Sequence, residues 1–167
     1  MKFSNLETAL FGLYNWARQD TNKAIDYQMA FGVKSTLPSD KLLDNIVTAR
    51  IVIKELELFC TQNELTVLRF YYGFTDRFEN NPEQHLITDI VYPKDKTIGL
   101  LIATAWRDDI DNSELISILR KCCQRQAYRI MKSGKNILAG IRVKLINSDY
   151  LLADQLEKCL IRHQLLK

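Results

Sequence analysis

Hydrophobic residues recur every three or four positions along most of this chain, the spacing of one face of an α-helix. The pattern predicts a first helical segment from Asn5 to about Ala30, which polar residues 19–23 can divide into two helices. Ser4 is its expected N-cap, with Glu7 three residues later as capping-box partner. A second helix is expected to begin at Ser39 or Asp40, after the loop signals Gly32 and Pro38. Its core stripe is expected to be Leu42, Leu43, Ile46, Val47, Ile53 and Leu56.

The middle of the chain mixes clear and ambiguous signals. Thr61 and Glu64 have the spacing of a capping box, and they predict a short helix that Gly73 ends in the left-handed conformation. Pro82 can begin another helix that runs to about Val91. The apolar run 97–106 suits a buried helix or a strand equally well. We therefore expect a small irregular insert at about 75–112, with which two short strands are compatible.

The helical pattern resumes at Ser113 and continues to the end of the chain. Asp111 and Glu114 can cap a short helix from Ser113 to Arg120, and a three-residue connection, 121–123, would then lead into a longer helix over 124–145. This is the spacing of a helix-turn-helix. Because no proline interrupts 113–145, one long helix is the alternative interpretation. A last helix is expected after it, with Asn147 or Ser148 as its cap.

Composition supports a helical fold. Only 6 glycines and 3 prolines are available for tight turns, while 47% of the residues are hydrophobic and 26% are charged. The prediction is an all-α multi-helix bundle with a basic helix-turn-helix-like pair near its end. Residues 1–112 would form a helical core with the insert, and 113–167 the basic part, packed with the core as one compact unit. No apolar run is long enough to span a membrane, and no signal core follows Met1, so we expect a cytoplasmic protein.

Charge is distributed unevenly along the chain. Residues 1–112 carry 12 basic and 16 acidic side chains, whereas residues 113–167 carry 11 and 4, a net charge of +7. No acidic residue lies between Arg120 and Lys144, and the cations of this stretch would repel one another unless an anionic surface compensated them. This asymmetry points to an anionic partner.

On a helical wheel, the stretch 124–145 has a core-facing stripe and a basic face. Ala127, Ile130, Met131, Gly134, Leu138, Ile141 and Leu145 share one arc about 100° wide. Outside that arc lie arginines and an amide, which make bidentate contacts with bases, together with lysines and a tyrosine, which hold phosphates. The prediction is a regulator that binds duplex DNA. The candidate binding residues are Arg120, Lys121, Gln124, Arg125, Arg129, Lys132, Lys135 and Arg142.

A family resemblance points the same way. The stretch Glu64-Leu-Thr-Val-Leu-Arg-Phe-Tyr-Tyr-Gly73 resembles the helix that opens the promoter-reading C-terminal region of bacterial sigma factors. The tryptophan-bearing N-terminal segment and the helix expected over 44–58 resemble the Q-type antitermination regulators of lambdoid phages. The resemblance implies a DNA-binding transcription regulator that contacts RNA polymerase. By this resemblance Gln124, Arg125, Arg129 and Lys132 match recognition-helix positions.

Other function classes find less support. No nucleophile elbow, Gly-rich phosphate loop or paired metal-ligand spacing occurs, so we expect no enzyme, cofactor or metal site. The four cysteines are expected to be small buried hydrophobic residues in a reducing compartment. The alternative function is a protein-interaction module whose basic face binds an acidic protein partner. A homodimer is left open.

Overall fold

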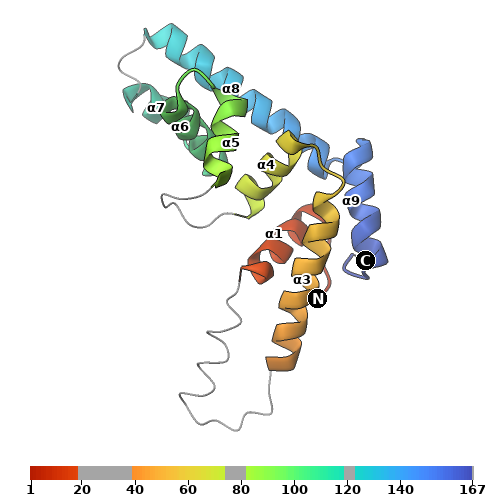
Figure 1. The fold of residues 1–167 in the computed structure, drawn as a ribbon. Helices are drawn as coiled ribbons and strands as arrows, with labels where there is room; N and C mark the ends of the chain where they lie inside the picture. Colours follow the sequence, from red (N-terminus) through yellow and green to blue (C-terminus); the bar gives the residue numbers. More distant parts are fainter. Residues whose placement is uncertain (19–38, 74–81, 119–122, 167) are drawn as a thin grey trace, which may run out of the picture. The chain divides into compact units, whose positions relative to one another are not determined.

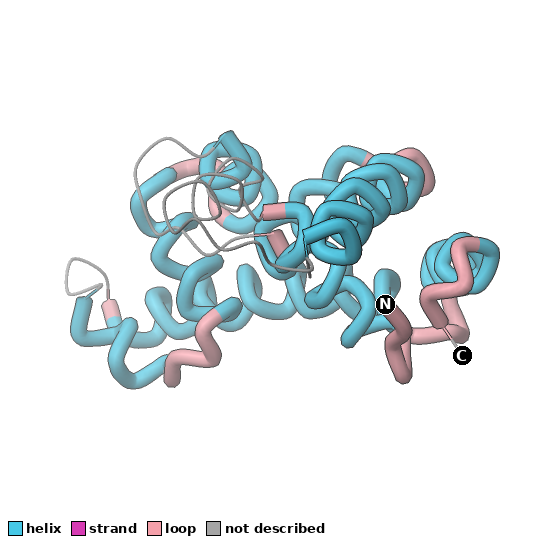
Figure 2. The backbone as a smooth tube through the Cα atoms, turned by 90° about the horizontal axis from the view of Figure 1, so that it is seen from below, coloured by secondary structure: helices cyan, strands magenta, loops and turns pink. Residues whose placement is uncertain are grey.

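The structure, a computed structural model, describes residues 1–18, 39–73, 82–118 and 123–166. Within these ranges the regular elements are α-helices joined by loops (Figure 2). Strand pairing in the same ranges is limited to one isolated parallel bridge between Phe3 and Leu166. The predicted all-α fold class is confirmed. In the described ranges, no helix has the length and apolar character needed to cross a membrane. The helices divide into two compact units, Met1–Phe59 with Leu151–Lys167, and Cys60–Tyr150.

The first unit contains α1 (Leu6–Ala17), α3 (Ser39–Glu57) and α9 (Leu151–Arg162), which pack against one another (Figure 1). Each helix buries one apolar stripe in a shared core. Side chains with less than 2% exposure include Leu10, Leu13, Ile46, Leu56 and Leu156. Val47, which the sequence placed on this stripe, is 51% exposed. Its neighbour Ile46 takes the core position, since adjacent helical residues lie about 100° apart around the axis.

The start of α1 differs from the predicted capping box. Asn5 has extended backbone angles, and its Oδ1 accepts a hydrogen bond from the Thr8 N–H at 2.8 Å. The N-cap is therefore Asn5 and not Ser4, because an asparagine oxygen one residue later reaches the same unsatisfied donors. The part of the expected segment beyond Arg18 lies outside the described residues.

The second unit contains α4 (Gln62–Tyr72), α5 (Pro82–Val91), α6 (Lys96–Arg107), α7 (Asn112–Ile118) and α8 (Gln124–Ile146). The long helix α8 packs against each of the other four (Figure 1). At the start of α4, Thr61 and Glu64 form the predicted capping box. Gly73 ends α4 as predicted, but its φ of −85° is right-handed, so the predicted left-handed stop is wrong.

Most of residues 82–112 is helical rather than irregular, with short connections at 92–95 and 108–111. The α5 and α6 helices pack against each other and against α8, and Ile87 and Ile102 are fully buried. The ambiguous run 97–106 is part of α6, which Asp95 caps by accepting hydrogen bonds from the N–H groups of Thr97 and Ile98. The expectation of an irregular insert is therefore wrong for the described part of 75–112. These helices are part of the core that positions α8.

The observed division into units differs from the boundary at Asn112 expected from charge. The basic helix α8 packs with α4, α5, α6 and α7, whereas α9 packs with α1 and α3. The charge gradient therefore does not follow the packing. Charged residues lie on the exposed face of a helix, whereas the apolar residues of its buried stripe determine which other helices it packs against.

Close approach between helices occurs at Gly134 in the middle of α8. A Cβ added there would lie 2.7 Å from Val91 Cγ1 and 2.9 Å from Ile102 Cγ2. Both neighbours are methyl groups on β-branched side chains, which have little rotamer freedom. By contrast, a Cβ added at Gly140, on the same helix, meets no heavy atom within 4 Å. The two glycines therefore provide a matched pair for testing the packing of α8.

Gly134→Ala should lower the free energy of unfolding, because overpacking costs about 1–3 kcal/mol and exceeds the gain of about 0.5–1 kcal/mol in helix propensity. Gly140→Ala should raise the free energy of unfolding by about 0.5–1 kcal/mol, since only the propensity gain applies there. Chemical denaturation of the full chain, followed by circular dichroism, measures both. Equal stabilisation by the two substitutions would contradict the close packing at Gly134.

Candidate nucleic-acid interface

The junction before α8 decides between the two interpretations of 113–145. Cys123 is the N-cap of α8, and its ψ of 134° is incompatible with a continuous helix. Helices α7 and α8 are therefore separate, and the single-helix alternative is wrong. Cys123 is exposed, so the expectation that the cysteines are buried holds for Cys159 but not for Cys123. Arg120 and Lys121 lie outside the described residues.

The start of α7 is fixed by Asp111. Its Oδ2 accepts a hydrogen bond from the Ser113 hydroxyl at 2.8 Å. This bond, together with hydrogen bonds from the backbone of Asn112 and Ser113 and the nearby charge of Lys135, lowers the pKa of Asp111 below its ordinary value. An ionised carboxylate also interacts favourably with the N-terminal end of a helix. The predicted cap at Asp111 is thus present, with α7 beginning at Asn112.

On α8 the predicted core stripe and polar face are both observed. Ala127, Met131, Gly134, Leu138 and Leu145 are buried, while Ile130 and Ile141 are partly exposed. On the opposite side, an exposed row of polar residues occurs at positions i, i+4, i+7 and i+11. This row, the α8 cationic stripe, consists of Arg125, Arg129, Lys132 and Asn136. At 1.5 Å per residue it is about 17 Å long.

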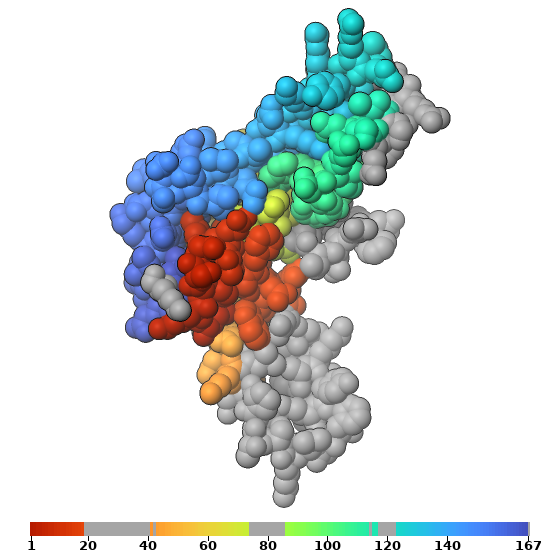
Figure 3. Space-filling model, turned by 180° about the vertical axis from the view of Figure 1, so that it is seen from behind, coloured from red at the N-terminus to blue at the C-terminus, as the bar shows by residue number. Residues whose placement is uncertain are grey.

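A shallow groove lies beside the first two turns of α8. It has a volume of about 410 Å³ and is lined by Ile116 of α7 together with Gln124, Arg125, Tyr128 and Arg129 of α8. Tyr128 is 44% exposed. In the space-filling view, side chains at the start of α8 (cyan) project outward from the helix (Figure 3). Two cations, an amide and a phenol therefore surround one hollow, a combination that suits an anionic group with a planar neighbour.

Lys135 has a different environment from the α8 cationic stripe. Its Nζ donates a hydrogen bond to the backbone carbonyl oxygen of Ile110 at 2.8 Å. Ile110 follows the C-terminal end of α6, where its N–H bonds to the Ala105 carbonyl and Asp109 is left-handed with φ of 53°. Lys135 therefore ties α8 to the turn between α6 and α7. Its ammonium group is engaged within the unit rather than presented on the exposed row.

Arg142 also differs from its predicted place. Its guanidinium carbon lies 4.4 Å from the centre of the Tyr71 ring, in cation–π geometry. The Tyr71 ring in turn contacts Trp106, with 4.9 Å between ring centroids. Arg142 is thus part of an aromatic cluster between α4, α6 and α8. The sequence placed Arg142 among the candidate DNA-binding residues, whereas in the structure it lies against aromatic side chains of α4 and α6.

The residues that carry the sigma-like resemblance are mostly in the core of the second unit. Val67, Leu68, Phe70 and Tyr72 of α4 are all at most 4% exposed. Packing within the unit therefore accounts for the apolar part of that motif. The polar part is carried by the capping box and by Arg69, which is partly exposed.

No family model, curated protein or solved structure matches the chain.

Proposed function

We propose that this protein binds duplex DNA through α7 and α8 and acts as a transcription regulator. The observation that carries the proposal is the α8 cationic stripe, which begins at the N-terminal end of a helix separated from α7 by an extended residue. Its arginines suit guanine edges, and its lysine suits phosphates. No acidic residue occurs between Glu114 and Asp149 to neutralise these charges locally.

The start of α8 adds to this argument. Cys123 makes no side-chain hydrogen bond to the first turn, and that turn contains no acidic residue. The backbone N–H groups of this first turn and the positive end of the helix dipole can therefore bind an anion such as a backbone phosphate of DNA. The sigma-like resemblance of 64–73 supports RNA polymerase as a further partner.

Fluorescence anisotropy with labelled duplexes tests the proposal. A pool of random duplexes is first enriched on the full-length protein, and the enriched and random sequences are then titrated at several salt concentrations. Specific binding should be tighter than random binding by about 10³-fold or more. If Lys132 neutralises one phosphate, log Kd should rise with log salt with a slope of at least roughly 0.9. Unchanged anisotropy at low salt would refute the proposal.

A protein-interaction module is the second candidate function. Ile137 and Val143 on α8 are 41% and 39% exposed, and these apolar side chains suit an acidic amphipathic partner better than a phosphate backbone. A pull-down that survives nuclease treatment, combined with no DNA binding, would favour this function.

Two lysines one turn apart on α8 should behave differently. Lys132→Ala should reduce the salt slope of DNA binding by roughly 0.9 and leave the free energy of unfolding unchanged, because it removes one exposed phosphate contact. Lys135→Ala should leave the slope unchanged but lower the free energy of unfolding by about 1–2 kcal/mol, because it removes the hydrogen bond to Ile110. Anisotropy and chemical denaturation measure the two effects. Equal salt slopes for the two variants would contradict the different environments of Lys132 and Lys135.

A further inference from the structure

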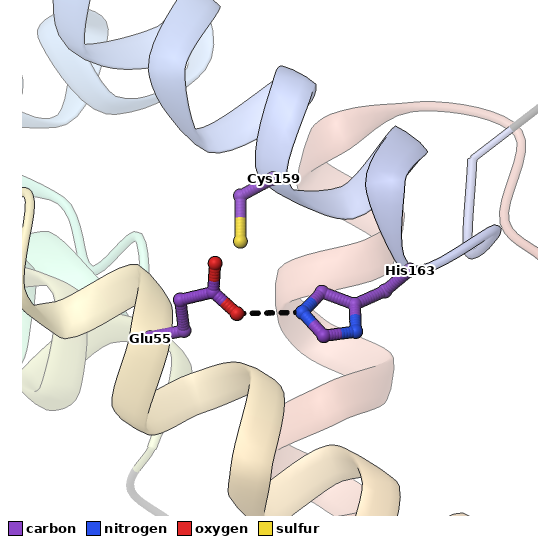
Figure 4. A group of neighbouring side chains, drawn as sticks. All are labelled: Glu55, Cys159 and His163. Atoms are coloured by element: carbon purple, nitrogen blue, oxygen red, sulfur yellow. Dashed lines mark hydrogen bonds and ion pairs between the residues drawn. The ribbon is translucent and has the colours of Figure 1, made fainter.

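Three side chains with metal-binding atoms meet in the first unit, whereas the α8 cationic stripe belongs to the second unit. Glu55 is on α3, Cys159 is on α9, and His163 directly follows α9 (Figure 4). Their ligand atoms all lie within 4.8 Å of one another. Cys159 is fully buried, whereas the side chains of His163 and Glu55 are 27% and 28% exposed. The cluster therefore has a buried side and a side open to solvent.

The order of these groups does not suit nucleophilic catalysis. In Figure 4 the Glu55 carboxylate lies between the Cys159 sulfur and the His163 ring. A cysteine nucleophile needs the imidazole next to the thiol, where it can take the proton. Burial, followed by the charge of Glu55, also raises the pKa of Cys159 to about 11. The thiol is thus protonated near neutral pH, and its neighbour in the cluster is the Glu55 carboxylate rather than the His163 imidazole.

The same arrangement fits a metal ion. Tetrahedral Zn²⁺ with a thiolate, an imidazole and a carboxylate places the ligand atoms roughly 3.3–3.6 Å apart. In the structure, His163 Nε2 lies 2.6 Å from Glu55 Oε2, and no pair of ligand atoms exceeds 4.8 Å. Small side-chain movements therefore suffice to surround an ion. We propose that Glu55, Cys159 and His163 form a Zn²⁺ site with a water molecule as the fourth ligand.

Binding at this site requires three changes. Zn²⁺ replaces the proton of the Cys159 thiol, which passes to solvent as the Zn–S bond forms. The hydrogen bond between His163 Nε2 and Glu55 Oε2 breaks, so that the neutral imidazole can bind the ion through a nitrogen that carries no proton. Arg162, whose Nη1 lies 2.7 Å from Glu55 Oε1, must also move from the carboxylate. Its side chain is 63% exposed, so the guanidinium can turn into water. The ion then takes over the role of Arg162 in linking α3 to α9.

Zn²⁺ and Co²⁺ titrations of the full-length protein test the site. Isothermal titration calorimetry should show one equivalent of Zn²⁺, which a chelator removes. Co²⁺ should give a thiolate-to-cobalt charge-transfer band and the visible bands of tetrahedral Co²⁺. Cys159→Ser and His163→Gln should each weaken Zn²⁺ binding by more than about 100-fold, since even outer hydrogen-bond partners of a ligand contribute 10–100-fold. Arg162→Gln should tighten binding severalfold, because a competing cation is removed.

Cys123→Ser is the matched control, because it removes an exposed thiol in the other unit and should leave Zn²⁺ binding unchanged. Circular dichroism shows whether each variant remains folded. If Cys159→Ser does not fold, His163→Gln carries the test. Absence of Zn²⁺ binding by the folded parent, or binding that persists in folded Cys159→Ser or His163→Gln, would overturn the site. Neither result bears on DNA binding, since the proposed ligands and the α8 cationic stripe belong to different units.

Discussion

Leu138→Ala should lower the free energy of unfolding of the second unit by about 2–5 kcal/mol. Leu138 is fully buried on α8, the helix against which α4, α5, α6 and α7 all pack. Truncation to alanine loses the free energy gained by burying the leucine side chain away from water. It also leaves a cavity that the close-packed neighbouring side chains fill only in part. Chemical denaturation of the full-length protein, monitored by circular dichroism, measures the change.

The adjacent residue provides the control for this prediction. Ile137 is 41% exposed, and Ile137→Ala should change the free energy of unfolding by no more than about 1 kcal/mol. Because isoleucine and leucine have the same number of atoms, a difference between the two variants reports burial rather than side-chain size. Similar losses for the two substitutions would mean that α8 packs with a different face.

The double substitution Arg125→Ala with Arg129→Ala should weaken specific DNA binding by about 2–6 kcal/mol, because a side chain bidentate to a base contributes roughly 1–3 kcal/mol. Discrimination between enriched and random duplexes should be lost as well. Both arginines are exposed and line the groove beside α7, so the protein should remain folded. Anisotropy titrations with the two kinds of duplex measure affinity and discrimination together.

A charge-matched control separates a specific contact from general attraction. The double substitution Lys94→Ala with Lys96→Ala also removes two positive charges from the second unit, at exposed positions around the start of α6. This pair should weaken binding of enriched and random duplexes by the same factor, because neither lysine is among the groove-lining residues and each contributes only general attraction to the DNA. Equal loss of discrimination in both double variants would make net charge the cause and would refute a recognition role for α8.

Sequence patterns predicted those helix features that depend on neighbouring residues. The Thr61–Glu64 capping box, the start of α5 at Pro82 and the core stripe of α8 are all observed. Capping involves residues three positions apart, and a core stripe repeats every three or four. Local patterns were wrong or left two answers open where two local solutions compete. Asn5 rather than Ser4 is the N-cap of α1. The run 97–106, for which the sequence left helix and strand open, is part of α6, which Asp95 caps.

Only the tertiary structure decided which cations of α8 remain available to a partner. Arg125 and Arg129 are exposed beside a groove, whereas Lys135 bonds to the Ile110 carbonyl and Arg142 lies over Tyr71. A helical wheel gives the direction of each side chain but not what lies opposite it. Those partners come from α4 and the turn after α6, which packing brings to α8.

By itself, the sequence determined that this protein is all-α, where most helices begin, and that an acid-free basic helix lies near its end. These properties follow from helix periodicity, capping and charge, which neighbouring residues set. The grouping of α9 with α1 and α3, and the meeting of Glu55 with His163 across 108 residues, were decided by tertiary structure. The Cys159–His163 spacing of four residues was visible in the sequence, but Glu55 was not linked to it by any local pattern. Contacts between distant residues depend on which buried stripes fit together, and that fit is a property of the whole packed core.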